Sequence, residues 1–171
     1  MFGDKELTAK DIDEVVELLA NLFRHDSYFL RLSNSTDAYE FYKREFRDSY
    51  ETVLKQGLSY KNKDTYIICI NLTKLRKEDP TSFEGMFGEV PAFIDYVSRE
   101  QKDVIYIFSI FSRKKVGYCS EVEKVLKDFI KRNSDKAIYC DGFAREDFLE
   151  ISAKTGCREI QISNLPYLVW R

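Results

Sequence analysis

The segment 104–123 combines three features that together could hold an anionic cofactor. An apolar run over 104–111 predicts a buried strand, residues 112–119 form a basic turn with one glycine, and Ser120 opens a stretch with helical spacing. The first turn of a helix presents unpaired backbone N–H groups and a partial positive charge, and the cations of the turn add to that charge. A phosphate or pyrophosphate could therefore bind there with little further help.

Plainer explanations of the same segment stay open. Ser120 and Glu123 have the spacing of a capping box, which starts a helix with no ligand at all. Arg113, Lys114 and Lys115 have the composition of a solvated run of charge. The turn is thus a cofactor site or the beginning of an ordinary capped helix.

The composition limits the classes of protein that this chain can be. With 171 residues, 44% of them hydrophobic and 33% charged, we expect a single domain over 1–171 with its own core. A formal net charge of −2 gives no general attraction for nucleic acid or for an anionic membrane, so an anion site must be local. The sequence has no run of roughly 20 apolar residues and no signal-peptide pattern at its start, which indicates a cytoplasmic protein.

Cysteine and histidine usage argues against metal chemistry. The four cysteines contain no C-x-x-C pair, and Cys69 and Cys140 lie in apolar runs, where we expect buried, reduced thiols. His25 is the one histidine, which excludes a zinc site built on two of them, and we predict no metal.

Periodicity and turn residues predict the elements that must position the turn. A helix follows the Thr8–Asp11 capping box, and a second helix over 37–56 ends before Gly57. The remaining predictions are a hairpin over 58–61 and 65–72, a loop over 76–88, a short helix over 90–100, a strand over 104–111, a helix over 120–132, a strand over 136–140, a helix over 145–155, and strands over 158–162 and 167–170. Strands 104–111 and 136–140 should be parallel, because a helix connects them, and ligands favour the carboxyl ends of such strands.

This order of elements resembles the GNAT family, the Gcn5-related N-acetyltransferases, across essentially the whole chain. The family's cofactor signature, Gln/Arg-x-x-Gly-x-Gly/Ala, falls on residues 114–119. Gly117 matches it strictly, Lys114 keeps the cationic character of the first position, and Cys119 is small where glycine or alanine is usual. The opening over 7–28 and the Lys154-Thr155-Gly156-Cys157 stretch agree with the same order.

The resemblance implies an α/β fold, a mixed α+β sheet flanked by helices, in which the fourth and fifth strands are parallel and splay apart. It implies acetyl-CoA, or another acyl-CoA, as the cofactor, with pantetheine on strand backbone and pyrophosphate on the turn. The implied cofactor-binding residues are Ser109, Ile110 and Phe111 on the strand and Lys114, Lys115, Val116, Gly117, Tyr118, Cys119 and Ser120 at the turn.

The implied chemistry is direct attack of an amine on a thioester, which needs a base and an acid. Asp103 falls near a position that carries a glutamate base in some members. The usual acid tyrosine position is Ser152 here, so Tyr139 or Tyr118 would have to replace it.

The resulting hypothesis is an N-acetyltransferase, an acyl-CoA-dependent N-acyltransferase whose acceptor is a small-molecule amine or a protein amino group. A homodimer stays open, and we expect no nucleic-acid or membrane partner. The alternative is a GNAT-like binding or regulatory module that has lost catalysis, which the missing tyrosine and the acidic Glu121 and Glu123 would favour.

Overall fold

The computed structural model describes residues 4–114, 118–141 and 146–171, and it contains one mixed seven-stranded sheet. The strand order across the sheet is β1-β2-β3-β4-β5-β7-β6. The strands are β1 (Lys5–Glu6), β2 (Tyr60–Asn62), β3 (Thr65–Asn71), β4 (Val104–Ser112), β5 (Ala137–Asp141), β6 (Arg158–Ile162) and β7 (Leu165–Trp170).

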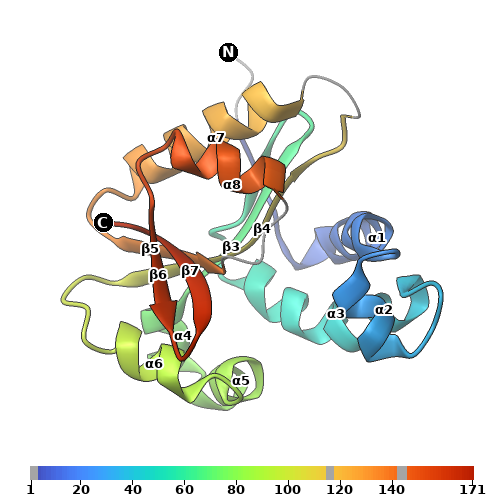
Figure 1. Cartoon of the computed structure of the whole chain (residues 1–171), viewed down its shortest axis with the longest axis horizontal. Coiled ribbons are helices and arrows are strands. Elements are labelled where there is room, and N and C mark those ends of the chain that lie inside the picture. Colours follow the sequence, from blue (N-terminus) through green and yellow to red (C-terminus); the bar gives the residue numbers. More distant parts are fainter. Residues whose placement is uncertain (1–3, 115–117, 142–145) are drawn as a thin grey trace.

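Helices cover both faces of this sheet (Figure 1). The helices are α1 (Ile12–Phe23), α2 (Ser27–Ser33), α3 (Tyr39–Lys55), α4 (Leu72–Glu78), α5 (Pro80–Phe87), α6 (Pro91–Val97), α7 (Tyr118–Arg132) and α8 (Glu146–Ala153), with a short 3-10 helix over Ala9–Asp11. Apolar residues of α1 and of α3 to α6 form one core cluster with the sheet, and α7 and α8 form a second cluster on the opposite face.

Local sequence signals explain several of these boundaries. The predicted capping box is present, because Thr8 and Asp11 bond to each other's backbone around the 3-10 turn that leads into α1. Gly57 follows the end of α3 with a φ of +68°, a conformation that favours glycine. The turn between β2 and β3 contains Lys63 with a φ of +52°, as the predicted hairpin requires.

The central prediction of a parallel pair is confirmed. β4 pairs in parallel with β5 and antiparallel with β3, and α7 connects β4 to β5. β3 is buried at nearly every position, which is expected for a strand covered on both faces. The mixed sheet flanked by helices is thus the fold class that the sequence predicts.

Two sequence predictions about local structure are wrong. The predicted loop over 76–88 belongs instead to α4 and α5. Asp79 caps α5 by accepting a hydrogen bond from the Ser82 N–H at 3.1 Å, and Pro80 lies in the first turn, where a helix does not need the N–H that proline lacks. Gly85 is compatible with α5, since a Cβ there would meet no atom within 4 Å. Ser120 does not cap a helix, because α7 has already begun at Tyr118.

A search of the described residues finds no helix long and apolar enough to cross a membrane. The same residues contain no group of three or more His, Cys, Asp or Glu side chains that could hold a metal ion.

Candidate active site

The candidate site lies where β4 and β5 part. Within the described residues, the two strands pair only from Val104 with Ala137 to Ile107 with Cys140. β4 continues to Ser112 and remains paired with β3, whereas β5 ends at Asp141. The second half of β4 therefore has a strand on one side and no described strand on the other.

A β-bulge marks the point of separation. Cys69 lies opposite Ile107 and Ile68 lies opposite Ser109, so Phe108 is an extra residue in β4. Its effect is visible in the packing: Tyr106 and Ile110 lie four positions apart in the strand, yet they belong to the clusters on opposite faces of the sheet. Strict alternation would place both on one face.

Hydrogen bonds on β3 show which way the backbone of β4 points beyond the bulge. The buried Ser59 hydroxyl accepts from the Cys69 N–H at 3.0 Å and donates to the Cys69 carbonyl at 3.1 Å, so the backbone N–H and C=O of Cys69 point away from β4. Ile67, two residues earlier, faces the same way, and its register partner on β4 is Ile110. Ile110 therefore directs its N–H and C=O away from β3, toward the side where β5 has ended.

This geometry divides the three predicted pantetheine-binding residues. Ser109 and Phe111 lie opposite Ile68 and Tyr66, whose backbone groups face β4, so their own groups belong to the β3 ladder. By the same alternation Ser112 joins Ile110 on the open side. Ile110 is thus the predicted residue whose backbone is placed to receive a ligand.

The basic turn is described only at its two ends. Lys115, Val116 and Gly117 lie outside the described residues, as does the side chain of Tyr118. Cys119 is exposed in the first turn of α7, and Ser120 is exposed inside that helix. The backbone amides of this first turn have no intrahelical acceptor, so the helix start that the prediction needs is present two residues earlier than expected.

The described cations of the turn have protein partners. Arg113 donates to the Tyr66 hydroxyl at 3.2 Å and lies 3.7 Å from the Glu14 carboxylate. Lys114 forms an ion pair with Glu121, which raises the pKa of Lys114. The other carboxylate oxygen of Glu121 is buried and has no hydrogen-bond partner among the described residues. Lys114 therefore compensates the acidic residue in the first turn of α7.

A carboxylate at the end of β5 faces a group of tyrosines. The Tyr106 hydroxyl of β4 donates to Asp141 at 3.5 Å, and Tyr167 of β7 lies opposite Asp141 in the sheet. Tyr50 of α3 completes the group, and its hydroxyl bonds to that of Tyr42 at 2.9 Å. Four elements thus contribute to one polar centre beside the point where β4 and β5 part.

Burial keeps these tyrosines protonated. It raises the pKa of Tyr106 well above its ordinary value and that of Tyr167 above 10, and the charge of Asp141 adds to both effects. Burial also raises the pKa of Tyr50 to about 12, although its hydrogen bond with Tyr42 acts in the opposite direction. Each of these hydroxyls can therefore donate a proton near neutral pH.

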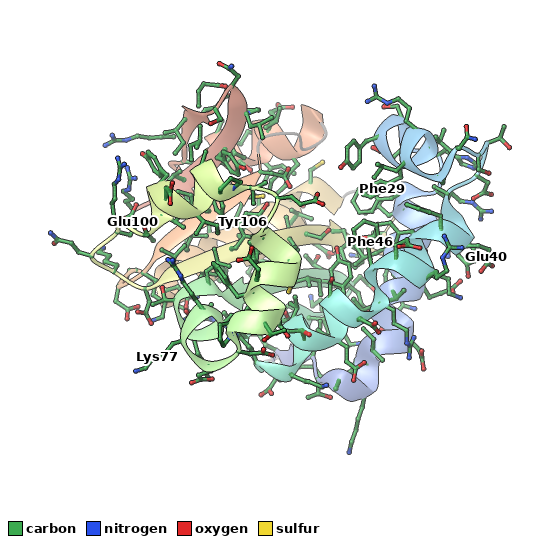
Figure 2. The ribbon with its side chains drawn as sticks, turned by 90° about the horizontal axis from the view of Figure 1, so that it is seen from below. Phe29, Glu40, Phe46, Lys77, Glu100 and Tyr106 are labelled. Atoms are coloured by element: carbon green, nitrogen blue, oxygen red, sulfur yellow. The ribbon has the colours of Figure 1, made fainter. Side chains whose placement is uncertain are left out.

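Aromatic rings surround this polar centre. The ring of the bulged Phe108 lies 6.1 Å from that of Tyr50 and 5.9 Å from that of Phe87, and Phe87 lies 5.6 Å from Tyr106. The aromatic cluster continues through Tyr42 to Phe46 of α3 and Phe29 of α2. Figure 2 shows Phe46 and Phe29 on the far side of the molecule from Glu100. A carboxylate next to such an aromatic cluster is suited to an organic cation.

The structure does not bring Asp103 or Tyr139 to this centre. Asp103 is the residue just before β4, and its carboxylate accepts a hydrogen bond from the Asn71 amide at 3.3 Å. It lies five residues before the bulge at Phe108, which is about 16 Å along the strand. Tyr139 is fully buried, and its hydroxyl donates to Glu100 and accepts from Arg171 at 3.1 Å, toward the amino ends of β4 and β5. Asp103 thus lies at the amino end of the parallel pair, and Tyr139, although it is opposite Tyr106 in the sheet, bonds through its hydroxyl to Glu100 and Arg171.

The sequence prediction missed Asp141. The signal was available, because Asp141 follows the buried strand 137–140 at its carboxyl end, where ligands of parallel strands collect. Ser152, at the position of the expected acid tyrosine, is fully buried, and its hydroxyl has no hydrogen-bond partner among the described residues.

Comparisons with known proteins give a match in structure alone. No protein-family model matches the sequence, and no curated protein does. The C-terminal condensation domain of Ebony, solved with β-alanyl-dopamine, is similar with a TM-score of 0.67 at 9% identity, over 99% of this chain and 98% of that one. Arylalkylamine N-acetyltransferase 2 from Aedes aegypti is similar with a TM-score of 0.63 at 12% identity, over 98% and 97% of the two chains.

A bacterial enzyme extends the likeness. The N-acetyltransferase from Staphylococcus aureus Mu50 has a TM-score of 0.57 at 16% identity and is matched over its full length by 98% of this chain. At these identities the comparisons show the fold, and the fold is that of the acetyltransferases.

Proposed function

Starting from its GNAT fold, we propose that this protein is an acyl-CoA-dependent N-acyltransferase that transfers acetyl from acetyl-CoA to an amine by direct attack. The observation that carries the proposal is the separation of β4 from β5 after four paired residues, which leaves the backbone of Ile110 facing the side of β5 with no strand partner among the described residues. A separated parallel pair provides a polar edge inside the molecule, where a ligand with amide groups can bind as a strand would.

The chain's residues fit such a cofactor. The backbone groups of Ile110 and Ser112 would bond to the amide groups of the pantetheine arm, and the first turn of α7 would hold the phosphates of coenzyme A. The ion pair of Lys114 with Glu121 removes most of the repulsion that an acidic first turn would exert on a phosphate. Bound acetyl-CoA would supply an acyl group activated as a thioester.

Asp141 and Tyr106 are our candidates for proton handling. An amine is an ammonium ion near neutral pH, and its nitrogen must lose a proton before it can attack. Asp141 would accept that proton, and Tyr106, whose hydroxyl lies 3.5 Å from Asp141, would donate one to the leaving thiolate. As the N–C bond forms and the C–S bond breaks, the nitrogen would lose a second proton to water, and Asp141 would return its proton to Tyr106. The nitrogen thus loses two protons and gains the acyl group, while one proton ends on the departing sulfur and one in solution.

The surroundings of Asp141 favour a small amine with an aromatic group over a protein amino group as the acceptor. The rings of Phe87 and Phe108 lie beside Tyr106 and Tyr50, and Tyr106 bonds to the carboxylate, so an ammonium ion and a second ring would have aromatic neighbours there. Two of the similar structures are named for such chemistry, an arylalkylamine N-acetyltransferase and a condensation domain with β-alanyl-dopamine.

The test is release of free thiol from acetyl-CoA in the presence of three acceptors: phenethylamine, an aliphatic diamine and a lysine peptide. We expect phenethylamine to give the highest kcat/KM, and we expect acetyl-CoA alone to raise the melting temperature, because a ligand of the native state stabilises it. No thermal shift at saturating acetyl-CoA would refute the proposal at the level of cofactor binding.

The same assay addresses the alternative of a module that binds cofactor without catalysis. The buried, unpartnered Ser152 hydroxyl at the expected tyrosine position is the observation that favours this alternative. A thermal shift with acetyl-CoA but no thiol release with any acceptor would support it, and a gain of turnover in Ser152→Tyr would identify the missing acid as the cause.

A further inference from the structure

A cavity lies at the opposite end of β4 from the candidate active site. It has a volume of about 390 Å³ and is formed by α4, by the beginning of α5 and by the segment 97–104 that leads from α6 into β4. Figure 2 shows Lys77 and Glu100 on this side of the molecule, with Tyr106 between them and Phe29 and Phe46. Its size is at the lower end of the range for small-molecule sites, roughly 300 to 1,000 Å³.

The floor of this cavity is apolar. Leu72, Phe83, Val97 and Val104 line it, and each is less than a tenth exposed as a residue. The guanidinium of Arg76 lies 5.5 Å from the centre of the Phe83 ring, so one cation is held directly over this floor. A compact apolar group could bury its surface there while remaining next to a positive charge.

The rim of the cavity has an excess of positive charge. Arg76, Lys77 and Lys102 line it together with Glu100 and Asp103. Glu100 is already engaged, because it forms an ion pair with Arg171 at 2.8 Å and accepts from Tyr139. Three cations therefore share the rim with one acid that is outside an ion pair among the described residues, Asp103, whose carboxylate accepts a 3.3 Å hydrogen bond from Asn71.

Two of these cations lack acidic partners in the part of the chain that the structure describes. Arg76 and Lys77 form no ion pair or hydrogen bond there, whereas Lys102 donates to the Ser134 carbonyl at 3.4 Å and lies close enough to Asp135 to help lower the pKa of that carboxyl. Lys74 of the same helix differs, since it reaches Glu78 at 4.0 Å and does not line the cavity. The unpaired cations of α4 are thus the two that face the apolar floor.

We propose that this cavity binds a small organic anion, with one phosphate or carboxylate group on a compact aromatic or aliphatic body. The head group would lie between Arg76, Lys77 and Lys102, with the planar guanidinium of Arg76 suited to two parallel hydrogen bonds. The body would lie on Phe83 and its apolar neighbours. The site is separate from the proposed acyl-transfer centre and uses none of its residues.

Titration of the full-length protein, followed by amide NMR shifts, tests this proposal without acyl-CoA or amine present. The probes are phenyl phosphate and benzoate. Inorganic phosphate, which has the charge without the ring, and phenol, which has the ring without the charge, are the controls. We expect an aryl anion to saturate shifts around Arg76, Lys77 and Lys102 and to bind about tenfold or more tightly than either control. The better of the two aryl anions identifies the head group.

Matched variants of α4 complete the test. Arg76→Gln and Lys77→Gln should each weaken aryl-anion binding, Arg76→Gln by about tenfold, whereas Lys74→Gln on the same helix should leave it unchanged. These side chains are exposed, so the fold should persist, and the unperturbed NMR spectrum of each variant checks this. Equal weakening by Lys74→Gln, equal binding of inorganic phosphate, or the absence of saturating shifts would overturn the proposal while leaving the proposed transferase function unaffected.

Discussion

Replacement of Asp141 by Asn tests the proposed proton chemistry, because it removes the charge and keeps the shape of the side chain. Over the 3.5 Å between Asp141 and the Tyr106 oxygen, two unit charges interact with about 1.2 kcal/mol in water and about 5 kcal/mol at an effective dielectric constant near 20. Tyr106 is buried and Asp141 is partly buried, so the lower figure is the minimum. The pKa of Tyr106 should then fall by at least about one unit, which the phenolate absorbance during an alkaline titration measures.

The kinetic effect of Asp141→Asn should be larger. Loss of a positioned base lowers kcat/KM by about 100-fold to 10,000-fold, and the variant should depend on amine that has already lost its proton in solution. Its kcat/KM should therefore rise about tenfold per pH unit up to the pKa of the acceptor. Asp48→Asn, which removes an exposed carboxylate from α3, is the matched control. A variant with wild-type kcat/KM, or an equal loss in Asp103→Asn, would refute the assignment.

Three further predictions concern the scaffold. Ser59→Ala should lower the free energy of unfolding by about 2 to 4 kcal/mol in urea titrations, because it leaves the buried N–H and C=O of Cys69 without partners, and a loss below about 0.5 kcal/mol would contradict this. Hydrogen bonds from the Tyr66 hydroxyl and Lys61 hold the pKa of Glu14 below 4.5, so the stability that ionised Glu14 contributes is present above about pH 4.5 and is lost as the pH falls through the folded-state pKa. The difference in free energy of unfolding between wild type and Glu14→Gln should therefore shrink below that pH. A difference that stays constant with pH would be inconsistent with these contacts. Burial raises the pKa of Cys69 and Cys140, so in the native protein the exposed Cys119 should react rapidly with a disulfide reagent and those two only on unfolding; persistence of the rapid phase in Cys119→Ser would argue against this.

Periodicity in the sequence was sufficient to predict the helices and strands that have a strongly apolar face or an apolar run. The strand over 104–111, the helix behind Thr8, the helix over 37–56 that the structure places at Tyr39–Lys55, and the parallel relation of β4 and β5 follow from such patterns and from their order. The predicted loop over 76–88 failed because Pro80 and Gly88 were interpreted as interruptions of structure. In the fold they stand at the beginning and just past the end of α5, where proline and glycine are tolerated.

The candidate site was harder to predict because it depends on direction within the sheet. Asp103 precedes one buried strand and Asp141 follows another, but the sequence prediction selected Asp103 alone, and only the pairing pattern shows at which end β4 and β5 part. The bulge at Phe108 is likewise invisible in the alternating apolar letters. It determines that Ile110, and not its neighbours Ser109 and Phe111, directs its backbone to the open side.

Hydrogen exchange of the β4 amides tests the central claim most directly, because the claim is that the strand has one unpaired edge beyond the bulge. Without ligand, the Ile110 amide should exchange much faster than those of Ser109 and Phe111, which belong to the β3 ladder. Saturating acetyl-CoA should slow exchange at Ile110 and leave its two neighbours unchanged. Equal protection of all three amides in the free protein, or exchange at Ile110 that acetyl-CoA does not alter, would contradict the account.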